Sequence, residues 1–240
     1  MPRPALWSGI AATLLVEITG GHYPPGARLP TESALSNRFG VNRHTVRAAL
    51  ADLAARGLVH ARRGAGVFVT APATDYPLGR RVRFHRNVEG SGRTPSRRLT
   101  RLETRAADAA EAAALALAPG AMVHVCEGVS LADGVPVATF RSVFPAERLP
   151  GMLRHLAEVA SVTRALAAEG VADYTRASTR LTARIARGPR AQLLQVPEGA
   201  PVLRSEAVNV DTTGVPVEYG RTWFAGDRVT LVVAGEDAPD

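Results

Sequence analysis

The 240-residue chain has no lysine, one cysteine and an aromatic content of only 5%. The single cysteine, Cys126, cannot form an internal disulfide, and no cysteine or histidine spacing resembles a zinc site. We therefore expect no metal ion and no cofactor. The sequence also lacks a signal-peptide core and any run of about 18 apolar residues. A cytoplasmic protein without a membrane partner is the resulting prediction.

Because lysine is absent, all 29 basic residues are arginine, and the formal net charge is +7. The planar guanidinium group suits phosphates and guanine edges, so this bias favours an anionic partner. Codon usage in a G+C-rich genome would produce the same bias, so the charge is supporting evidence only. Apolar residues make up 46% and charged residues 21%, which excludes the composition of a disordered chain. The length predicts two domains.

Three helical segments are expected in the first 57 residues. Apolar residues recur every three or four positions in 6–20, which predicts one helix with a buried side. Thr31 and Gly40 are residue types that begin and end a second helix, and Asn42 and Gly57 do the same for a third.

The third helix has two chemically different sides. Its apolar residues follow the i, i+3, i+4, i+7 spacing, while Arg43, His44 and Arg47 fall on the opposite side. The two arginines lie one turn apart, so both can reach guanine edges or phosphates. Alone, such a basic pair is more often a solvated helix face. The interpretation as a DNA-reading helix therefore depends on the neighbouring elements.

A wing is expected directly after this helix. From residue 58 the apolar period changes to two, which predicts strands at 59–62 and 67–69 joined by a glycine-containing tip at 63–66. Three helices and a wing form a winged helix-turn-helix, which holds one helix in the major groove of DNA. Residues 1–72 also carry a net charge of +5, most of the total. The predicted DNA contacts are Arg28, Ser33, Asn42, Arg43, His44, Thr45, Arg47, Arg62, Arg63 and Gly64.

Residues 72–79 contain two prolines and a glycine, so we place an interdomain linker there, between domains at 1–71 and 80–240. The second domain alternates helices, one of them expected at 106–117, with strands rich in β-branched residues. Two long hairpins and no βαβ series favour an antiparallel sheet with helices on one face. The predicted fold class is therefore α+β, and the two hairpins with their helices indicate an internal duplication.

An arginine cluster begins the second domain, because residues 80–105 contain nine arginines and two glutamates. This charge suits a phosphate or phosphonate ligand, although a solvated basic surface or an extra DNA contact would explain it equally well. Arg86 is expected at the start of a short helix, where backbone N–H groups also favour an anion. Arg141, Ser178 and Arg180 are expected on strands and are predicted to point inward, toward the same effector.

The DNA-reading motifs carry a family resemblance. The segments Pro25–Glu32, Gly40–Arg47 and Arg62–Val69 resemble the GntR family of bacterial regulators. The resemblance implies a transcription factor that binds a palindromic operator in double-stranded DNA as a homodimer. Many relatives carry a basic residue where Ser33 stands, so a phosphate contact is expected to be missing there.

From residue 75 onward the chain resembles the effector domain of the HutC subgroup, a UTRA domain whose fold is similar to chorismate lyase. The segments that carry this resemblance are 83–86, 131–137 with 144–145, and 214–219 with 226–228. It implies a small anionic effector and adds His85, Glu218 and Phe224 as effector contacts. Glu218 matches an acidic position that holds ligand hydroxyls in sugar-phosphate relatives.

Three departures from the subgroup leave the identity of the effector open. Relatives often carry a tyrosine where Phe224 stands and arginines where Gly128 and Ser130 stand. Residues 75–78, with Arg83-Phe84 and Asn87, are most similar to regulators of phosphonate metabolism. The implied function is a repressor of genes for phosphonate uptake and degradation. A regulator of sugar-phosphate or amino-acid catabolism is the alternative.

Two other classes of protein fit parts of this pattern. An enzyme is one, because a lyase-like fold does not by itself fix function. However, the six histidines are scattered and no carboxylates are paired, so we expect no catalytic residues. A nonspecific architectural DNA-binding protein is the other. The sequence leaves open the operator and whether the effector releases or promotes DNA binding.

Overall fold

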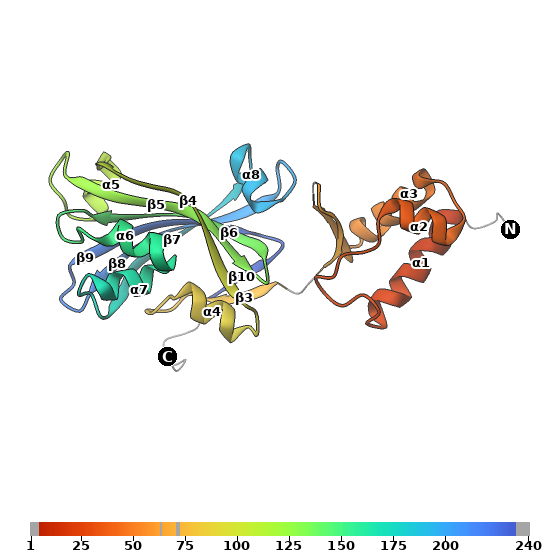
Figure 1. The fold of residues 1–240 in the computed structure, drawn as a ribbon, viewed down its shortest axis with the longest axis horizontal. Helices are drawn as coiled ribbons and strands as arrows, with labels where there is room; N and C mark the ends of the chain where they lie inside the picture. The colour runs from red at the N-terminus through yellow and green to blue at the C-terminus, as the bar shows by residue number, and fades with distance from the viewer. Residues whose placement is uncertain (1–4, 63, 71–72, 234–240) are drawn as a thin grey trace. The chain divides into compact units, whose positions relative to one another are not determined.

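The structure, a computed structural model, describes residues 5–62, 64–70 and 73–233. Within these ranges no helix is long and apolar enough to cross a membrane. The chain divides into two compact units, residues 1–72 and 73–240, and each unit has its own hydrophobic core. Figure 1 labels their helices and strands.

The first unit consists of three helices and a two-stranded antiparallel hairpin (Figure 1). Its elements are α1 (Leu6–Thr19), α2 (Glu32–Phe39), α3 (Arg43–Ala55), β1 (Val59–Arg62) and β2 (Gly66–Val69). Thr31 and Asn42 accept hydrogen bonds from backbone N–H groups in the first turns of α2 and α3, and Gly40 ends α2 with a φ of 64°. Leu14 of α1 and Leu53 of α3 lie in the core. The predicted winged helix-turn-helix is confirmed.

The second unit is built on a six-stranded antiparallel sheet with the strand order β4-β5-β6-β9-β8-β7. Two further strands, β3 and β10, form a separate parallel pair. The elements are β3 (Thr74–Pro77), α4 (Phe84–Gly90), β4 (Pro95–Ala106), α5 (Ala109–Ala114), β5 (Met122–Ala132), β6 (Val135–Pro145), α6 (Met152–Val159), α7 (Val162–Ala168), β7 (Tyr174–Ile185), α8 (Pro189–Leu194), β8 (Pro201–Asp211), β9 (Pro216–Ala225) and β10 (Val229–Val232). The predicted α+β class is confirmed.

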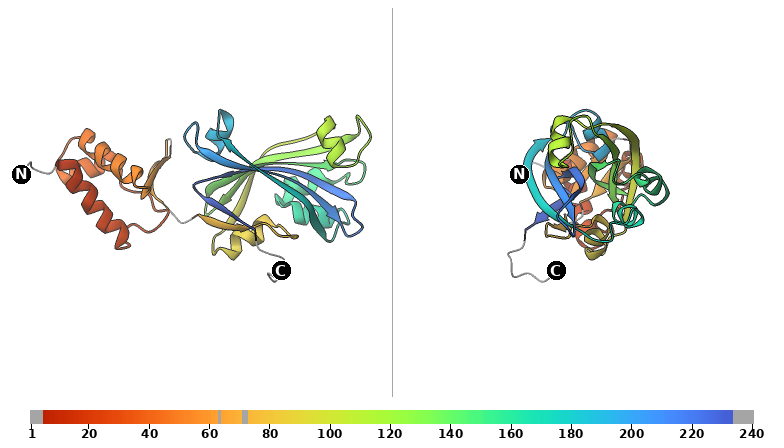
Figure 2. Two further views of the ribbon diagram at one scale, coloured as in Figure 1. Left: turned by 180° about the vertical axis from the view of Figure 1, so that it is seen from behind. Right: turned by 90° about the vertical axis from the view of Figure 1, so that its left-hand side faces the viewer.

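Helices cover both faces of this sheet, so the prediction of helices on one face is wrong. Helices α6 and α7 pack against Cys126 and Phe144, while the neighbouring residues Val125 and Val143 face α5. Successive side chains of a strand point to opposite faces, which separates the two layers. Figures 1 and 2 show α5 and α8 on one side and α6 and α7 on the other. We call these the α5/α8 face and the α6/α7 face.

The sheet has two halves with the same order of elements. One half is β4-α5-β5-β6 and the other is β7-α8-β8-β9, and β6 pairs with β9 to join them. Their hairpins turn at Gly134 and Gly214, where φ is 74° and 83°. Each hairpin also has a register shift shortly before its turn, after Ser130 and after Asn209. The internal duplication indicated by the sequence therefore has a structural counterpart.

Two segments differ from the sequence prediction. The helix expected at 106–117 spans only Ala109–Ala114, because the residues before it form the edge strand β4. The expected linker at 72–79 contains β3, in which Thr74 and Tyr76 are buried and the backbone pairs with β10. Sequence patterning missed both strands because β4 is rich in exposed arginines and β3 is only four residues long.

Candidate DNA-binding surface and effector pocket

The exposed side of α3 carries three of the predicted DNA contacts. Arg43, His44 and Arg47 are all exposed, whereas Val46 between them lies in the core. The Arg47 side chain is 62% exposed, and its Nε donates a hydrogen bond of 2.8 Å to Glu32 of α2. One carboxylate thus orients this guanidinium group and leaves it accessible.

Asn42 and Thr45 fix the first turn of α3. The Oδ1 atom of Asn42 accepts a hydrogen bond of 2.9 Å from the Thr45 N–H and one of 3.0 Å from the Thr45 hydroxyl. Both side chains therefore help to hold the exposed arginines of this turn in place. Their predicted contacts with DNA stay a prediction.

A concave surface brings three other predicted contacts together. Arg28, Ser33 and Arg43 line it, beside Gly66 of β2. Gly66 has a φ of 111°, which favours glycine, and a Cβ atom there would lie 2.8 Å from the Arg28 Nε and push this side chain aside. The backbone before α2 is also hydrogen-bonded to β2. The wing, the start of α2 and the start of α3 thus meet at one surface.

The tip of the wing is described in part. Arg62 is the last residue of β1, and Gly64 follows at the tip with a φ of 75°. Arg63 lies outside the described residues. The DNA contacts proposed for these three residues stay predictions.

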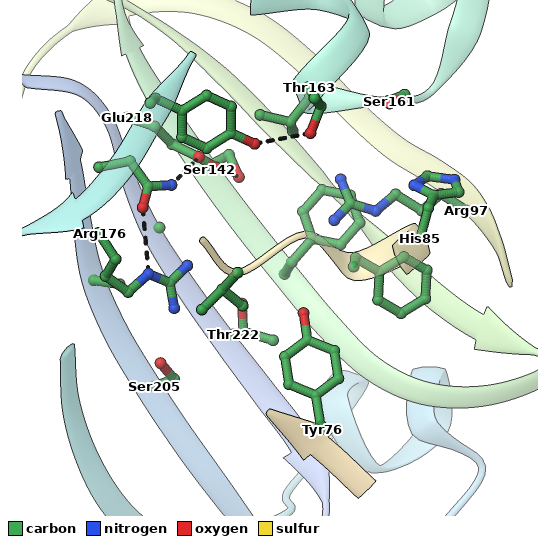
Figure 3. A pocket seen from close by; sticks show the side chains of 18 of the residues that line it. Tyr76, His85, Arg97, Ser142, Ser161, Thr163, Arg176, Ser205, Glu218 and Thr222 are labelled. Carbon is green, nitrogen blue, oxygen red and sulfur yellow. Dashed lines mark hydrogen bonds between the residues drawn. The ribbon is translucent and has the colours of Figure 1, made fainter. Parts of the chain in front are cut away.

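The second unit contains a cavity of about 70 Å³ on the α6/α7 face of its sheet (Figure 3). Side chains from β6, β7, β8 and β9 line it, together with residues from β3, α4, β4 and α7. Its wall is polar, with two arginines, one glutamate and several hydroxyl groups. The polar lining residues are Tyr76, His85, Arg97, Ser142, Ser161, Thr163, Tyr174, Arg176, Ser205, Asn209, Glu218 and Thr222.

Glu218 is held in the wall of this cavity by two donors. The Ser142 hydroxyl donates to Oε1 and the Asn209 amide donates to Oε2, each at 2.6 Å. The other end of the Asn209 amide accepts a hydrogen bond of 3.2 Å from the Arg176 Nε. A carboxylate offers about four acceptor sites, so Glu218 can still accept hydrogen bonds from a ligand.

Arg97 reaches the cavity from the side opposite Arg176 (Figure 3). Its guanidinium carbon lies 4.5 Å from the centre of the Phe140 ring and 5.1 Å from that of Phe84. The Arg97 Nε is buried and has no hydrogen-bond partner among the described residues. Sequence reasoning missed both cavity arginines. The signal that points to them is the internal duplication, because they occupy matching places in the two halves.

His85 and Tyr76 complete the wall near Arg97. Burial and the Arg97 charge hold the pKa of His85 below its ordinary value, so the imidazole is neutral at pH 7. Burial raises the pKa of Tyr76, and the ring of Tyr76 packs against Phe224 with 5.1 Å between ring centres. The fixed charges of the cavity are therefore two guanidinium groups and one carboxylate, which favours an anionic ligand group.

Three of the seven predicted effector residues line this cavity, namely His85, Glu218 and Phe224. Arg86 lies instead in a neighbouring, more open pocket that it shares with His85. In that outer pocket Asp173 forms an ion pair of 3.3 Å with Arg83. Arg86 is thus placed outside the cavity, because α4 turns its apolar side rather than Arg86 toward the sheet.

The other three predicted effector residues lie on the α5/α8 face, so their expected inward position is wrong. Phe140 and Ser142 line the cavity, and Arg141 between them points to the opposite face, where it donates to Glu127 at 2.5 Å. Ser178 and Arg180 pair with residues of β8 that alternate with its cavity-lining residues. The strands were predicted correctly, but the face of the sheet that lines the cavity was not.

A winged helix with exposed guanidinium groups and a second unit with a polar cavity define the class of ligand-responsive transcriptional regulators. Residues 6–69 match the gntR family of bacterial regulatory proteins, and residues 90–230 match the UTRA domain. The chain belongs to the GntR family, and its UTRA domain places it in the HutC subgroup. It is thus a regulator that binds DNA and a small-molecule effector.

Similar proteins have the same architecture. The chain is 42% identical to an uncharacterised HTH-type transcriptional regulator of Rhizobium meliloti, over 95% of this chain and 93% of that protein. It is 30% identical to the HTH-type transcriptional repressor NagR of Bacillus subtilis, over 93% of this chain and 91% of NagR. The crystal structure of PhnF from Mycobacterium smegmatis superposes with a TM-score of 0.67 at 28% identity, covering 95% of this chain and 99% of that one. These relatives are regulators rather than enzymes.

Proposed function

We propose that this chain represses genes for phosphonate uptake and degradation, and that a phosphate or phosphonate compound controls its affinity for the operator. The observation that carries the proposal is the cavity, in which two arginines have no carboxylate ion-pair partner among the described residues. Arg97 and Arg176 are both half-buried, and a guanidinium group without a carboxylate partner favours an anionic ligand group. The chain also resembles the phosphonate-metabolism regulator PhnF, and this resemblance supports the same pathway.

On DNA, the chain acts as a homodimer on a palindromic operator. Arg43 and Arg47 enter the major groove, where a guanidinium group can bind guanine O6 and N7 together. Arg28 contacts a phosphate. Its position at the concave surface beside the wing supports this role. The exposure of the two α3 arginines supports this arrangement.

A regulator of a sugar-phosphate pathway is the second candidate. Glu218 lines the cavity, can accept hydrogen bonds from ligand hydroxyls, and matches an acidic position of the sugar-phosphate relatives that the sequence resembles. Both candidates require an anionic group in the cavity. They differ only in what the rest of the effector carries.

A DNase I footprint of the full chain on its own promoter region tests the proposal. We expect a protected site with two-fold symmetry, because each subunit of a homodimer reads one half-site. The footprint is repeated at the same salt concentration with inorganic phosphate, methylphosphonate, ribose 5-phosphate and glucosamine 6-phosphate. A response to phosphonate or phosphate supports the proposal, and a response to a sugar phosphate alone favours the second candidate. No protected site at any protein concentration would contradict both.

A further inference from the structure

The two cavity arginines occupy matching positions in the two halves of the sheet. Arg97 on β4 pairs with Ser130, and Arg176 on β7 pairs with Asn209. Ser130 and Asn209 are the residues after which the two hairpins shift register. Because β4 and β7 are the two edge strands, the matching side chains reach the cavity from opposite sides (Figure 3).

The two halves differ in the hydrogen-bond partners of their cavity arginine. Asn209 accepts a hydrogen bond from the Arg176 Nε and donates one to Glu218, so Arg176 is connected to a carboxylate through one amide. Arg97 has no such connection, and its buried Nε lacks a partner among the described residues. The duplication thus places one supported and one unsatisfied guanidinium group around a single cavity.

Aromatic rings hold Arg97 in place without neutralising it. Its guanidinium carbon lies over the rings of Phe140 and Phe84, an arrangement in which the ring faces stabilise a cation. Gly128 makes this possible, because a Cβ atom there would lie 2.9 Å from the Phe140 ring and 2.6 Å from a backbone oxygen. The N–H donors of Arg97 therefore remain available to a ligand.

We propose that Arg97 binds the anionic group of the effector and that Glu218 binds a hydrogen-bond donor of the same molecule. The effector is then a small molecule with a phosphonyl or phosphoryl group at one end and an ammonium or hydroxyl group at the other. This inference rests on the proposed function, because it says which end of the proposed effector binds at each side of the cavity. It adds Arg97, which the sequence did not single out, as the residue that selects for the anion.

Isothermal titration of the full chain with three matched probes tests this assignment. Ethylphosphonate carries only the anion, whereas 2-aminoethylphosphonate and 2-hydroxyethylphosphonate add one donor. We expect Arg97→Gln to weaken all three by about tenfold or more, since a charge-assisted hydrogen bond is lost. Arg98→Gln is the matched control, because this exposed neighbour on β4 points to the other face. The Arg98→Gln variant should bind all three probes with the affinities of the wild-type chain.

Glu218→Gln tests the other end of the ligand. The wild-type chain should prefer the two donor-bearing probes to ethylphosphonate, and Glu218→Gln should lose most of that preference while still binding ethylphosphonate. Thermal unfolding and operator binding without ligand show whether each variant is folded. If Arg97→Gln does not fold, Arg97→Lys keeps the charge but not the planar fork, and it should weaken the probes by a smaller factor.

Several outcomes would overturn the assignment. The first is a folded Arg97→Gln variant that binds the probes with unchanged affinity. The second is a wild-type chain that shows no saturable binding of any probe or of glucosamine 6-phosphate. The third is a wild-type chain that does not prefer the two donor-bearing probes to ethylphosphonate. Failure of the proposed function is a different result. In that case glucosamine 6-phosphate binds in an Arg97-dependent manner, and the phosphonates bind weakly and leave the footprint unchanged. Such binding would still support the role of Arg97.

Discussion

Arg47 is the α3 arginine that can be tested most directly, because its side chain is accessible and its one ion pair is known. Glu32 holds its Nε at 2.8 Å, and the rest of the guanidinium group faces outward. If it binds a base edge, Arg47→Ala should weaken operator binding by about 1 to 3 kcal/mol. Fluorescence anisotropy with a labelled operator at fixed salt measures this loss.

Arg56→Ala is the matched control for that prediction. Arg56 follows the C-terminal end of α3, pairs with Asp52 at 3.4 Å and carries the same charge. If only overall charge mattered, both variants would lose the same affinity. Equal losses for Arg47→Ala and Arg56→Ala, or no loss for Arg47→Ala, would contradict the placement of Arg47 at the bases.

Individual effector residues were harder to predict than the strands that carry them. Glu218 was found through a family resemblance, but Arg141 was expected in the cavity and lies on the α5/α8 face. Alternation along a strand gives two faces without saying which one holds the ligand. A bulge between Leu99 and Arg101 further interrupts the alternation on β4. Arg97 was missed because no local pattern indicated a strand there.

Among the elements, the short helix α5 depends on one buried carboxylate. Glu111 is fully buried, accepts two hydrogen bonds of 2.7 Å from Arg105 and completes a capping box with Asp108. The Arg105 guanidinium holds the pKa of Glu111 below its ordinary value. We expect Glu111→Gln to lower the free energy of unfolding by about 3 kcal/mol at pH 7, because a buried ion pair loses one partner.

The pH dependence of this loss follows from the direction of the pKa shift. Because the folded pKa lies below the unfolded value of about 4.3, the ion pair stabilises fully above that value. Its contribution disappears as the pH falls through the folded pKa. The difference between wild type and Glu111→Gln should therefore shrink below about pH 4.

Urea unfolding at pH 7 and at lower pH measures this difference. A Trp7→Phe background leaves Trp223 as the only tryptophan, so its fluorescence reports the second unit. Glu158→Gln is the control, because the Glu158 side chain is 61% exposed. A constant difference at all pH values would argue against the ion pair as its cause.

Strand β3 connects the cavity to the segment that leads from the DNA-binding unit. Tyr76 on β3 lines the cavity, only four residues after the boundary between the units (Figure 3). Thr74 on the same strand accepts a hydrogen bond of 2.7 Å from Arg93. We therefore expect a ligand that contacts the Tyr76 hydroxyl to act on β3.

We expect Tyr76→Phe to raise the effector concentration needed for half of the operator response by about 5- to 30-fold, since one hydrogen bond is lost. Anisotropy titrations with 2-aminoethylphosphonate measure this shift. Tyr219→Phe removes a hydroxyl on the α5/α8 face, where it contacts Arg221, and should leave the response concentration unchanged. Equal shifts in both variants would show that the Tyr76 hydroxyl has no specific part in the response to the effector.

Elements with strong local signals were predictable. The caps Thr31 and Asn42 and the turn at Gly40 defined the helices of the first unit from residue types alone. The long hairpins were predictable for the same reason, because β-branched residues surround glycine turns. Strand β3 lacked such a signal, since it exists only through pairing with β10, more than 150 residues away. Long-range pairing is what the local pattern does not encode.

Over the whole molecule, many arginines form ion pairs with carboxylates, in the first unit as well as in the second. In the second unit Arg83, Arg93 and Arg105 form ion pairs with carboxylates. The arginine cluster at 80–105, for which the sequence left an anion site, a solvated surface and a DNA contact open, is therefore dispersed, and only Arg97 of the cluster lines the cavity. The first unit keeps a net charge of +5 for DNA. We therefore expect DNA recognition and anion recognition to belong to separate units.

The central claim is that an anion in the cavity controls binding to a specific operator. It is tested by anisotropy titration of the footprinted operator and a scrambled duplex at one salt concentration, with and without 2-aminoethylphosphonate. We predict a preference for the operator of about a thousandfold or more. The ligand should change this operator affinity by about 5- to 150-fold in the wild type. Arg97→Gln should need about tenfold more ligand, or more, for the same change. Equal affinities for the two duplexes, or an operator affinity that no phosphate or phosphonate changes, would contradict the claim.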